Sequence, residues 1–228
     1  MKKKIIGVLG GMGPKSTAPF INLVIEECQK QYGAKEDLDF PHMLIYSLPT
    51  PFYVDKPINS DAMIKTVCQG LKKLEKTGVD FIAIPCNTVH AYFSDFKKCI
   101  KVPILNIVDE TLRKIPKNIK NIGLFATQPT IDSAIYQKEL LNSGFKLIYD
   151  LEIQKQVNCL IKEVKTSGKS KKAEKSFNNL IKYLLAYDVG AVIIACTDLS
   201  VFCDKNKNLI FIDSSKSLAE AVIEKYLA

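Results

Sequence analysis

The feature that most constrains the fold is a strand-and-cysteine pattern that occurs twice. Residues 81–90 read FIAIPCNTVH, so an apolar run stops at a proline and is followed by Cys86. Residues 191–198 read AVIIACTD, and here the apolar run leads directly to Cys196. Short apolar runs of this kind predict buried strands. We therefore expect two thiols, each at the end of a buried strand.

A second repeat indicates that the whole chain consists of two similar halves. Residues 121–127, NIGLFAT, resemble residues 4–10, KIIGVLG. Gly7 and Gly123 are 116 positions apart, and the two motif cysteines are 110 positions apart. Two features that recur at nearly one spacing predict duplicated half-domains.

Strand and helix patterns alternate along the sequence, which predicts parallel sheets flanked by helices. We expect an α/β fold with two similar Rossmann-like domains related by pseudo-symmetry, residues 1–104 with 211–228, and residues 105–210. The expected strands are residues 4–9, 42–48, 81–84, 102–108, 121–126, 146–149, 191–195 and 209–213. The expected helices include residues 17–31, 61–76, 109–115, 154–165, 173–186 and 214–227.

The polar motifs follow the carboxyl ends of the expected strands, where sheets of this kind bind ligands. They are residues 10–14, 86–88, 127–130 and 196–197. They would converge if the two halves face each other. A helix should begin after each thiol, and the partial positive charge of a helix N-terminus shifts a thiol toward thiolate.

Composition and charge exclude several classes of protein. The chain has 25% charged and 47% hydrophobic residues, as soluble globular proteins do. No apolar run reaches the ~20 residues of a membrane helix, and the lysine-rich start leads into a glycine turn rather than a cleavage site. The net charge of +8 comes almost entirely from lysine, since Arg113 is the only arginine, which argues against nucleic-acid recognition. We expect a cytoplasmic protein with no nucleic-acid or membrane partner.

The seven cysteines are scattered and include no CxxC pair, so we expect neither a disulfide framework nor a metal site. Cys28, Cys68 and Cys159 lie within helical patterns, and we expect them to be small buried side chains. The glycine turn does not match G-x-G-x-x-G, and no acidic residue ends the second strand. These observations argue against a dinucleotide cofactor.

Two thiols on opposite faces of a substrate can invert an α-carbon next to a carboxylate. A thiolate removes the α-proton on one face, and a thiol returns a proton on the other. Backbone N–H groups and Asn or Thr side chains would stabilise the enolate-like intermediate. No lysine stands in an evident pyridoxal-phosphate motif, so we expect no cofactor.

From residue 5 to the C-terminus the chain resembles the cofactor-independent aspartate/glutamate racemase family. The motifs that carry the resemblance are GGMGP at 10–14, PCNTVH at 85–90, ATQPT at 126–130 and CTDL at 196–199. The resemblance implies two α/β domains with the active site in the cleft between them, in a homodimer. It also implies a small amino-acid substrate, aspartate or glutamate, with Cys86 and Cys196 as the acid/base pair. The substrate-contacting positions that it implies are Met12, Gly13, Asn87, Thr88, Thr127, Thr130, Lys165 and Thr197.

The sequence departs from the family pattern at three places. No arginine follows the second strand, where one would suit a distal carboxylate. The candidate cations are therefore lysines, with Lys165 first, and the others are Lys56, Lys169, Lys171 and Lys172. Ala195 and Asp198 stand where the family usually has glycine and glutamate. These departures bear on the substrate rather than on the chemistry.

Several interpretations stay open at this stage. Related enzymes with this architecture include hydantoin racemases, maleate isomerases and malonate decarboxylases, and a non-catalytic amino-acid-binding protein is a further alternative. His90 lies one turn after Cys86 and could polarise the thiol or support the helix. Thr127 and Thr130 could act only as helix caps.

Overall fold

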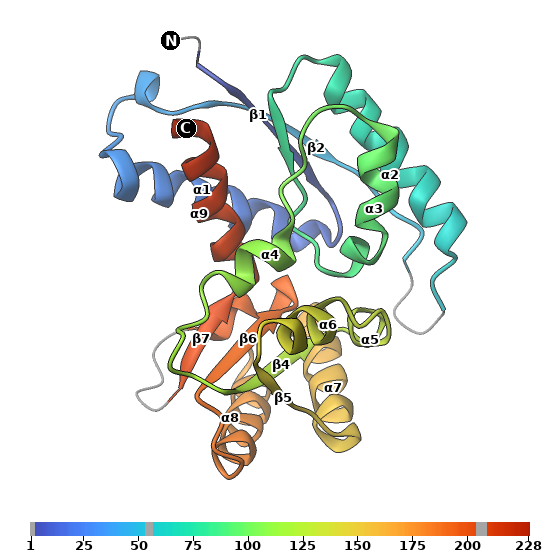
Figure 1. The fold of residues 1–228 in the computed structure, drawn as a ribbon, viewed down its shortest axis with the longest axis vertical. Helices are drawn as coiled ribbons and strands as arrows, with labels where there is room; N and C mark the ends of the chain where they lie inside the picture. Colours follow the sequence, from blue (N-terminus) through green and yellow to red (C-terminus); the bar gives the residue numbers. More distant parts are fainter. Residues whose placement is uncertain (1–2, 53–56, 204–208) are drawn as a thin grey trace. The chain divides into compact units, whose positions relative to one another are not determined.

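The computed structural model describes residues 3–52, 57–203 and 209–228. The chain divides into two compact units, which are described separately (Figure 1). Unit 1 comprises Met1–Glu110 with Ser215–Ala228, and unit 2 comprises Thr111–Ser214.

Unit 1 is built on a parallel three-stranded sheet in the order β2-β1-β3. Its strands are β1 (Ile5–Gly10), β2 (His42–Ser47) and β3 (Phe81–Ala83). Helices α1 (Thr17–Tyr32) and α9 (Ser214–Leu227) lie on one side of the sheet, and α2 (Ser60–Lys76) and α3 (Phe93–Cys99) lie on the other (Figure 1). The unit also contains the short helix η2 (Asp37–Asp39), and the short helix α4 (Ile107–Leu112) begins in it and ends in unit 2. Two further short helices are described with the candidate site.

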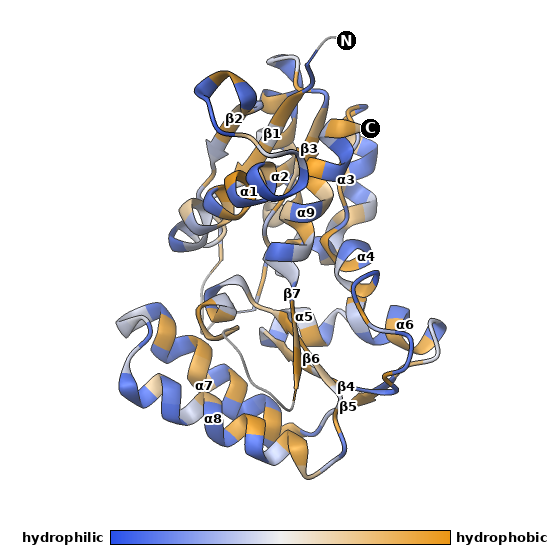
Figure 2. Cartoon of the chain, turned by 90° about the vertical axis from the view of Figure 1, so that its left-hand side faces the viewer, coloured by the Kyte–Doolittle hydropathy of each residue, from blue (hydrophilic) through white to orange (hydrophobic). Residues whose placement is uncertain are grey.

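Unit 2 contains a parallel four-stranded sheet in the order β5-β4-β6-β7. Its strands are β4 (Asn121–Ala126), β5 (Lys146–Ile148), β6 (Ala191–Ala195) and β7 (Ile210–Asp213). Helices α7 (Leu151–Ser167) and α8 (Lys171–Leu185) cover one face, and α5 (Gln128–Asp132) and α6 (Ile135–Asn142) lie on the other (Figures 1 and 2).

The same strand order therefore occurs in both units, with the first strand of each between the second and the third. Val8 of β1 pairs with Ala83 of β3, and Ala126 of β4 pairs with Ala195 of β6. The prediction of an α/β fold with two similar parallel sheets flanked by helices is confirmed.

The helices form where capping residues and apolar periodicity agree. The Asp150 side chain accepts the Ile153 N–H at 2.7 Å at the start of α7, and the Ser170 hydroxyl accepts the Ala173 N–H at 3.1 Å at the start of α8. Apolar side chains recur at helical spacing on one face of each of these helices, and the opposite faces are polar (Figure 2).

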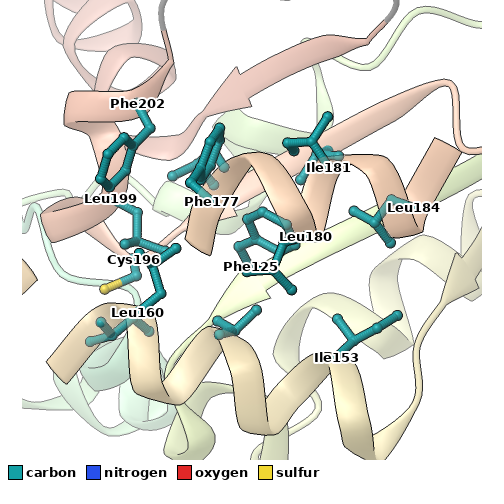
Figure 3. Packing of buried hydrophobic residues seen from close by; sticks show 14 of the residues in the cluster. Phe125, Ile153, Leu160, Phe177, Leu180, Ile181, Leu184, Cys196, Leu199 and Phe202 are labelled. Atoms are coloured by element: carbon teal, nitrogen blue, oxygen red, sulfur yellow. The ribbon is translucent and has the colours of Figure 1, made fainter. Parts of the chain in front are cut away.

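These apolar faces form the core of unit 2. Leu160 of α7 and Phe177, Leu180 and Leu184 of α8 are buried against Phe125 of β4 (Figure 3). Phe177 stacks on Phe202, with ring centroids 4.8 Å apart. Cys196 lies at one end of this cluster, close to Leu160, with its sulfur turned away from the packed rings (Figure 3). The core thus fixes the backbone that carries the second thiol.

Several predicted boundaries differ from the structure. Residues 102–108, predicted as a strand, form a single parallel bridge between Ile104 and Ile82. Pro103 within this segment has no N–H to donate, which limits the ladder. The predicted domain boundary at residue 211 falls inside β7, whereas β7 pairs along its length with β6. No helix in the described part of the chain has the length and apolar character needed to cross a membrane.

Candidate active site

The glycine turn after β1 has a tightly packed backbone. Gly11 has φ of 91°, and a Cβ at this position would lie 2.5 Å from the backbone nitrogen of Leu48. The Gly11 N–H donates to the Thr17 hydroxyl at 2.9 Å. Met12 and Gly13 follow, both partly exposed, and Gly13 precedes the 3₁₀ helix η1 (Pro14–Ser16). Only glycine fits the backbone at residue 11, and the turn presents the next two residues at the end of the sheet.

Cys86 lies three residues beyond β3, and its side chain is buried against the core of unit 1. Its backbone N–H donates to the Ile84 carbonyl at 2.8 Å, which forms a tight turn after the strand. Asn87 is also buried, and Thr88 is partly exposed. Because β1 and β3 are neighbours, Cys86 and the glycine turn lie at the same edge of one sheet.

His90 fixes this turn through its ring nitrogens. Nδ1 lies 2.7 Å from the Cys86 carbonyl oxygen, and the Ile107 N–H donates to Nε2 at 3.3 Å. Nε2 is therefore an acceptor, so Nδ1 carries the proton and donates to Cys86. Burial lowers the pKa of His90 and outweighs its bonds to the Cys86 and Leu105 backbone, which raise it. Of the two roles predicted for His90, the contacts support the structural one.

The helices that follow the thiols differ from the prediction. Cys86 and Asn87 precede η3 (Thr88–Tyr92), and Cys196 precedes η4 (Thr197–Phe202), and both are 3₁₀ helices. Short 3₁₀ helices align fewer peptide dipoles than long α-helices do. A 3₁₀ N-terminus therefore shifts a thiol toward thiolate less than the α-helix N-terminus that the sequence predicted.

Thr127 and Thr130 follow β4 and bond to each other. Thr127 is the N-cap of α5, where its hydroxyl oxygen accepts the Thr130 N–H at 3.4 Å, and the two hydroxyl oxygens are 2.9 Å apart. Thr130 is fully buried and Thr127 is partly exposed. Ala126 pairs with Ala195, so the threonines and Cys196 follow directly from neighbouring strands. The capping role is therefore present in the structure.

A charged pair lies beside Cys196. The Sγ atom of Cys196 is 4.0 Å from Oδ2 of Asp198, and the Lys165 ammonium lies 3.5 Å from the same oxygen. The side chains of Lys165 and Asp198 are 28% and 13% exposed. One carboxylate oxygen is thus shared by an ammonium and the second thiol.

Helix α7 also braces the end of β4. Gln154, buried on α7, donates from Nε2 to the Ala126 carbonyl at 3.0 Å and to Asn158 at 2.8 Å. Asn158 donates in turn to Gln128 at 3.1 Å. These bonds hold the segment that carries Thr127. Sequence reasoning gave none of these residues a role, although a glutamine on the apolar face of a helix was a usable signal.

The other cysteines have different surroundings. Cys28 is buried as predicted, and burial raises its pKa. Cys68 is partly exposed, and Cys159 is exposed, so the prediction that both are buried was wrong. Burial, reinforced by a hydrogen bond with Cys68, raises the pKa of Cys99 to about 12. No group of three or more potential metal ligands occurs within residues 3–52, 57–203 and 209–228.

The structure divides the predicted site residues between the two units. At the end of the first sheet it brings together Cys86 with Met12, Gly13, Asn87 and Thr88. At the end of the second it brings together Cys196 with Thr127, Thr130, Lys165 and Thr197. Lys56, another candidate cation, lies outside the described residues. Asp198 was noticed in the sequence only as a departure from a pattern, and its contact with Lys165 could not be seen there.

The fold has two similar parallel sheets, and a cysteine follows β3 in the first sheet and β6 in the second. Together with the comparisons that follow, this arrangement defines an isomerase of the amino-acid racemase class. The chain belongs to the Asp/Glu/Hydantoin racemase family, whose model matches residues 9–222. It is 47% identical over 225 residues to the broad specificity amino-acid racemase RacX of Bacillus subtilis (strain 168), covering 98% of this chain and 99% of that protein.

Solved structures agree with this assignment. An aspartate racemase from Picrophilus torridus superposes with a TM-score of 0.82 at 31% identity, covering 98% of this chain and 94% of that one. An aspartate racemase homologue from Pyrococcus horikoshii OT3 gives a TM-score of 0.80 at 26% identity, covering 100% of both chains. A glutamate racemase from Francisella tularensis shares the fold at 17% identity and a TM-score of 0.71, covering 100% of this chain and 82% of that one.

Proposed function

We propose that this chain interconverts L- and D-amino acids, aspartate or glutamate among them, by cofactor-independent proton transfer through Cys86 and Cys196. The observation that carries the proposal is the equivalence of the two thiols. Cys86 follows β3, which pairs with β1, and Cys196 follows β6, which pairs with β4. Residues with polar side chains come directly after each cysteine. The names of the related proteins, a broad specificity amino-acid racemase and an aspartate racemase, support the same activity.

In the proposed reaction the two sulfur atoms exchange roles at each turnover. The thiolate of one cysteine takes the α-proton, so an S–H bond forms while the electron pair of the C–H bond stays on the substrate. The thiol of the other cysteine then gives its proton to the opposite face of the α-carbon. One proton leaves carbon and one returns, so the atoms balance without an oxidant, a metal or an organic cofactor.

The remaining predicted residues would hold the substrate. We propose that Met12, Gly13, Asn87 and Thr88 contribute from unit 1, and that Thr127, Thr130, Lys165 and Thr197 contribute from unit 2. Backbone N–H groups and hydroxyls suit a carboxylate that becomes enolate-like, because they donate hydrogen bonds where negative charge develops. The partial exposure of Met12, Gly13, Thr88, Thr127 and Thr197 is consistent with such contacts.

Exchange of the α-hydrogen with solvent tests the proposed function. The protein is incubated with an amino acid in heavy water, and loss of the Cα–H NMR signal is followed together with the chirality of the product. We expect deuterium at Cα in the inverted enantiomer. An amino-acid-binding protein without turnover would give no exchange with any amino acid.

The other enzymes considered from the sequence are separated by their substrates. A maleate isomerase would interconvert cis and trans double bonds with a cysteine nucleophile, and a malonate decarboxylase would release carbon dioxide. A hydantoin racemase would exchange the α-hydrogen of a hydantoin but not that of a free amino acid. Hydantoins, maleate and a substituted malonate therefore belong in the same screen.

We further propose that the protein is a cytoplasmic homodimer. The cysteines are thiols rather than disulfides, as is usual in a reducing compartment. Strand β2 forms an edge of the first sheet, and Leu44 and Ile45 on it are 38% and 47% exposed. An exposed apolar edge strand is a surface that a second chain can cover.

A further inference from the structure

Gln154 is a polar side chain on the apolar face of a helix. It lies near the start of α7, is 2% exposed, and stands among the buried residues Ile153 and Val157. Its Nε2 atom donates to the Ala126 carbonyl at 3.0 Å and to Oδ1 of Asn158 at 2.8 Å. Both protons of the amide are therefore used, and one of them binds the last carbonyl of β4.

The Ala126 carbonyl lies on a part of β4 that extends beyond its neighbour. Strand β5 pairs with β4 as far as Gly123 and ends at Ile148, whereas β4 continues to Ala126. The chain then turns into α7, and Gln154 supplies a hydrogen bond to the part of β4 that β5 does not reach. Because the peptide between Ala126 and Thr127 is planar, a bond that fixes its carbonyl also fixes the backbone of Thr127.

A chain of side-chain hydrogen bonds sets the orientation of the Gln154 amide. Asn158 donates from Nδ2 to Oε1 of Gln128 at 3.1 Å, and Gln128 donates from Nε2 to Oδ1 of Asp132 at 2.7 Å. An ionised carboxylate only accepts hydrogen bonds, so each amide in the chain presents its nitrogen to the next member. The residue before Thr127 and the residue after it are thus both bound by side chains of α7.

The same arrangement leaves the side-chain oxygen of Gln154 without a donor. This Oε1 atom is buried and has no hydrogen-bond partner among the described residues. Gln154 therefore satisfies the Ala126 carbonyl but leaves its own carbonyl unpaired, and a buried unpaired carbonyl is unfavourable. The exchange gives little net stability, whereas it fixes the position of the Thr127 peptide.

We propose that Gln154 is a positioning residue for racemisation, which holds Thr127 where it contacts the substrate beside Cys196. Thr127 and Cys196 directly follow β4 and β6, which are neighbouring strands. A contact group that is misplaced by about 1 Å can cost about a hundredfold in rate. The proposal rests on the proposed racemase function, in which Thr127 contacts the substrate, and it adds a residue that acts only through Thr127.

The test is Gln154→Met, which keeps the length of the side chain and removes both donated hydrogen bonds. Racemisation kinetics are measured with an amino acid that the wild type accepts. We expect KM to rise roughly tenfold, the size of one hydrogen bond to a charged group. A loss of folded protein would lower kcat and leave KM unchanged, so KM separates positioning from stability.

Gln137→Met is the matched control. Gln137 on α6 donates from Nε2 to the Ile131 carbonyl at 2.8 Å, and its buried Oε1 atom also lacks a partner in the described part of the chain. The same substitution therefore removes a bond of the same kind at the other end of α5, beyond both threonines. KM of this variant should stay within about twofold of the wild-type value, less than the loss of one hydrogen bond to substrate.

A double-mutant cycle shows whether Gln154 acts through Thr127. In Thr127→Ala the proposed contact with the substrate is already lost, so adding Gln154→Met should change KM by no more than about twofold. Asn158→Ala is the second variant, for use if Gln154→Met does not fold, because Asn158 is partly exposed. It removes the acceptor that orients the Gln154 amide, and KM should rise about two- to threefold.

Three results would overturn the proposal for Gln154. They are a wild-type KM in folded Gln154→Met, an equal rise of KM in Gln137→Met, and effects of Gln154→Met and Thr127→Ala on KM that multiply in the double variant. Where Gln154→Met does not fold, an unchanged KM in Asn158→Ala overturns it. Absence of racemisation of every amino acid by the wild type would instead refute the proposed function.

Discussion

At the scale of single residues, His90 shows most clearly how one side chain fixes the backbone of the candidate site. It donates to the Cys86 carbonyl and accepts from the Ile107 N–H, so both ring nitrogens are occupied by backbone. A buried imidazole with a lowered pKa is neutral and cannot serve as a general base for the thiol without breaking these bonds. Its contacts hold the turn on which Cys86 stands.

The pKa of His90 predicts how stability depends on pH. The pKa is lowered in the folded state, so the unfolded chain binds the proton first as pH falls below about 6.5, the ordinary value. The unfolded state then binds more protons, and the free energy of unfolding decreases by up to about 1.4 kcal/mol per pH unit for this group. Urea unfolding between pH 7.5 and 5.5 should show the decrease.

His90→Gln provides the comparison for that measurement. The variant should lose about 1–3 kcal/mol at pH 7.5, since it leaves buried backbone groups poorly paired. It should also lack the part of the pH dependence that His90 causes. If wild type and variant lose stability equally between pH 7.5 and 5.5, His90 does not titrate as the structure implies.

Thiol labelling is a second test at this scale. Cys28 is buried and Cys99 has a pKa of about 12, so iodoacetamide should modify both slowly at pH 8. Cys159 is exposed and should be modified at the same rate with and without substrate. Cys86 and Cys196 should be modified faster than Cys28 and should be protected by a bound amino acid. Mass spectrometry of digested protein reads each site, and substrate protection confined to the other cysteines would contradict the assignment.

At the scale of elements, much of the structure could be predicted from the sequence. Buried strands in α/β proteins have apolar runs, and the runs at residues 121–126 and 191–195 correspond to β4 and β6. The two sheets could be predicted because the same motif recurs at nearly constant spacing. Cys159 could also have been placed correctly, since Val157, Leu160 and Ile161 define the buried face of α7 and residue 159 lies off it.

Other elements depend on contacts that sequence patterns do not contain. Whether residues 102–108 form a strand depends on hydrogen bonds with Ile82, and only two form there. The sequence pattern also did not show that the helix after each thiol begins as a 3₁₀ helix. The bond between Lys165 and Asp198 joins residues 33 positions apart on separate elements. The positions of Cys86 and Cys196 after buried strands were predictable, whereas the ion pair beside Cys196 was not.

Two roles of Thr127, the helix cap of α5 and the proposed contact with substrate, can be distinguished by experiment. Thr127→Ala removes the N-cap of α5 and should lower the free energy of unfolding by about 1 kcal/mol. Thr127→Asn restores a capping oxygen and should recover most of that stability. If Thr127 also contacts substrate, both variants should raise KM. An asparagine variant with wild-type stability and wild-type KM would limit Thr127 to the capping role.

At the scale of the whole molecule, the proposed homodimer can be tested through β2. Ile45→Lys places a charge on the exposed edge of the first sheet, where Ile45 is 47% exposed. The substitution should cost the isolated chain little stability, because the side chain is not in the core. Light scattering should report a dimer for the wild type and a weaker dimer for the variant. A monomeric wild type at micromolar concentration would contradict the dimer proposal.

Each of the two similar sheets has one motif cysteine beyond a strand, Cys86 after β3 and Cys196 after β6. We propose that inversion of the α-carbon needs both thiols. Racemisation and the elimination of HCl from β-chloroalanine can be measured by chiral chromatography and pyruvate formation on the wild type, Cys86→Ser and Cys196→Ser. Each serine variant should lose racemisation by at least about a hundredfold, since a hydroxyl is a poor acid/base group at neutral pH. Elimination needs only one base, so each variant should keep it for one enantiomer, which also shows that the fold is intact. Wild-type racemisation by either serine variant would contradict the two-thiol account.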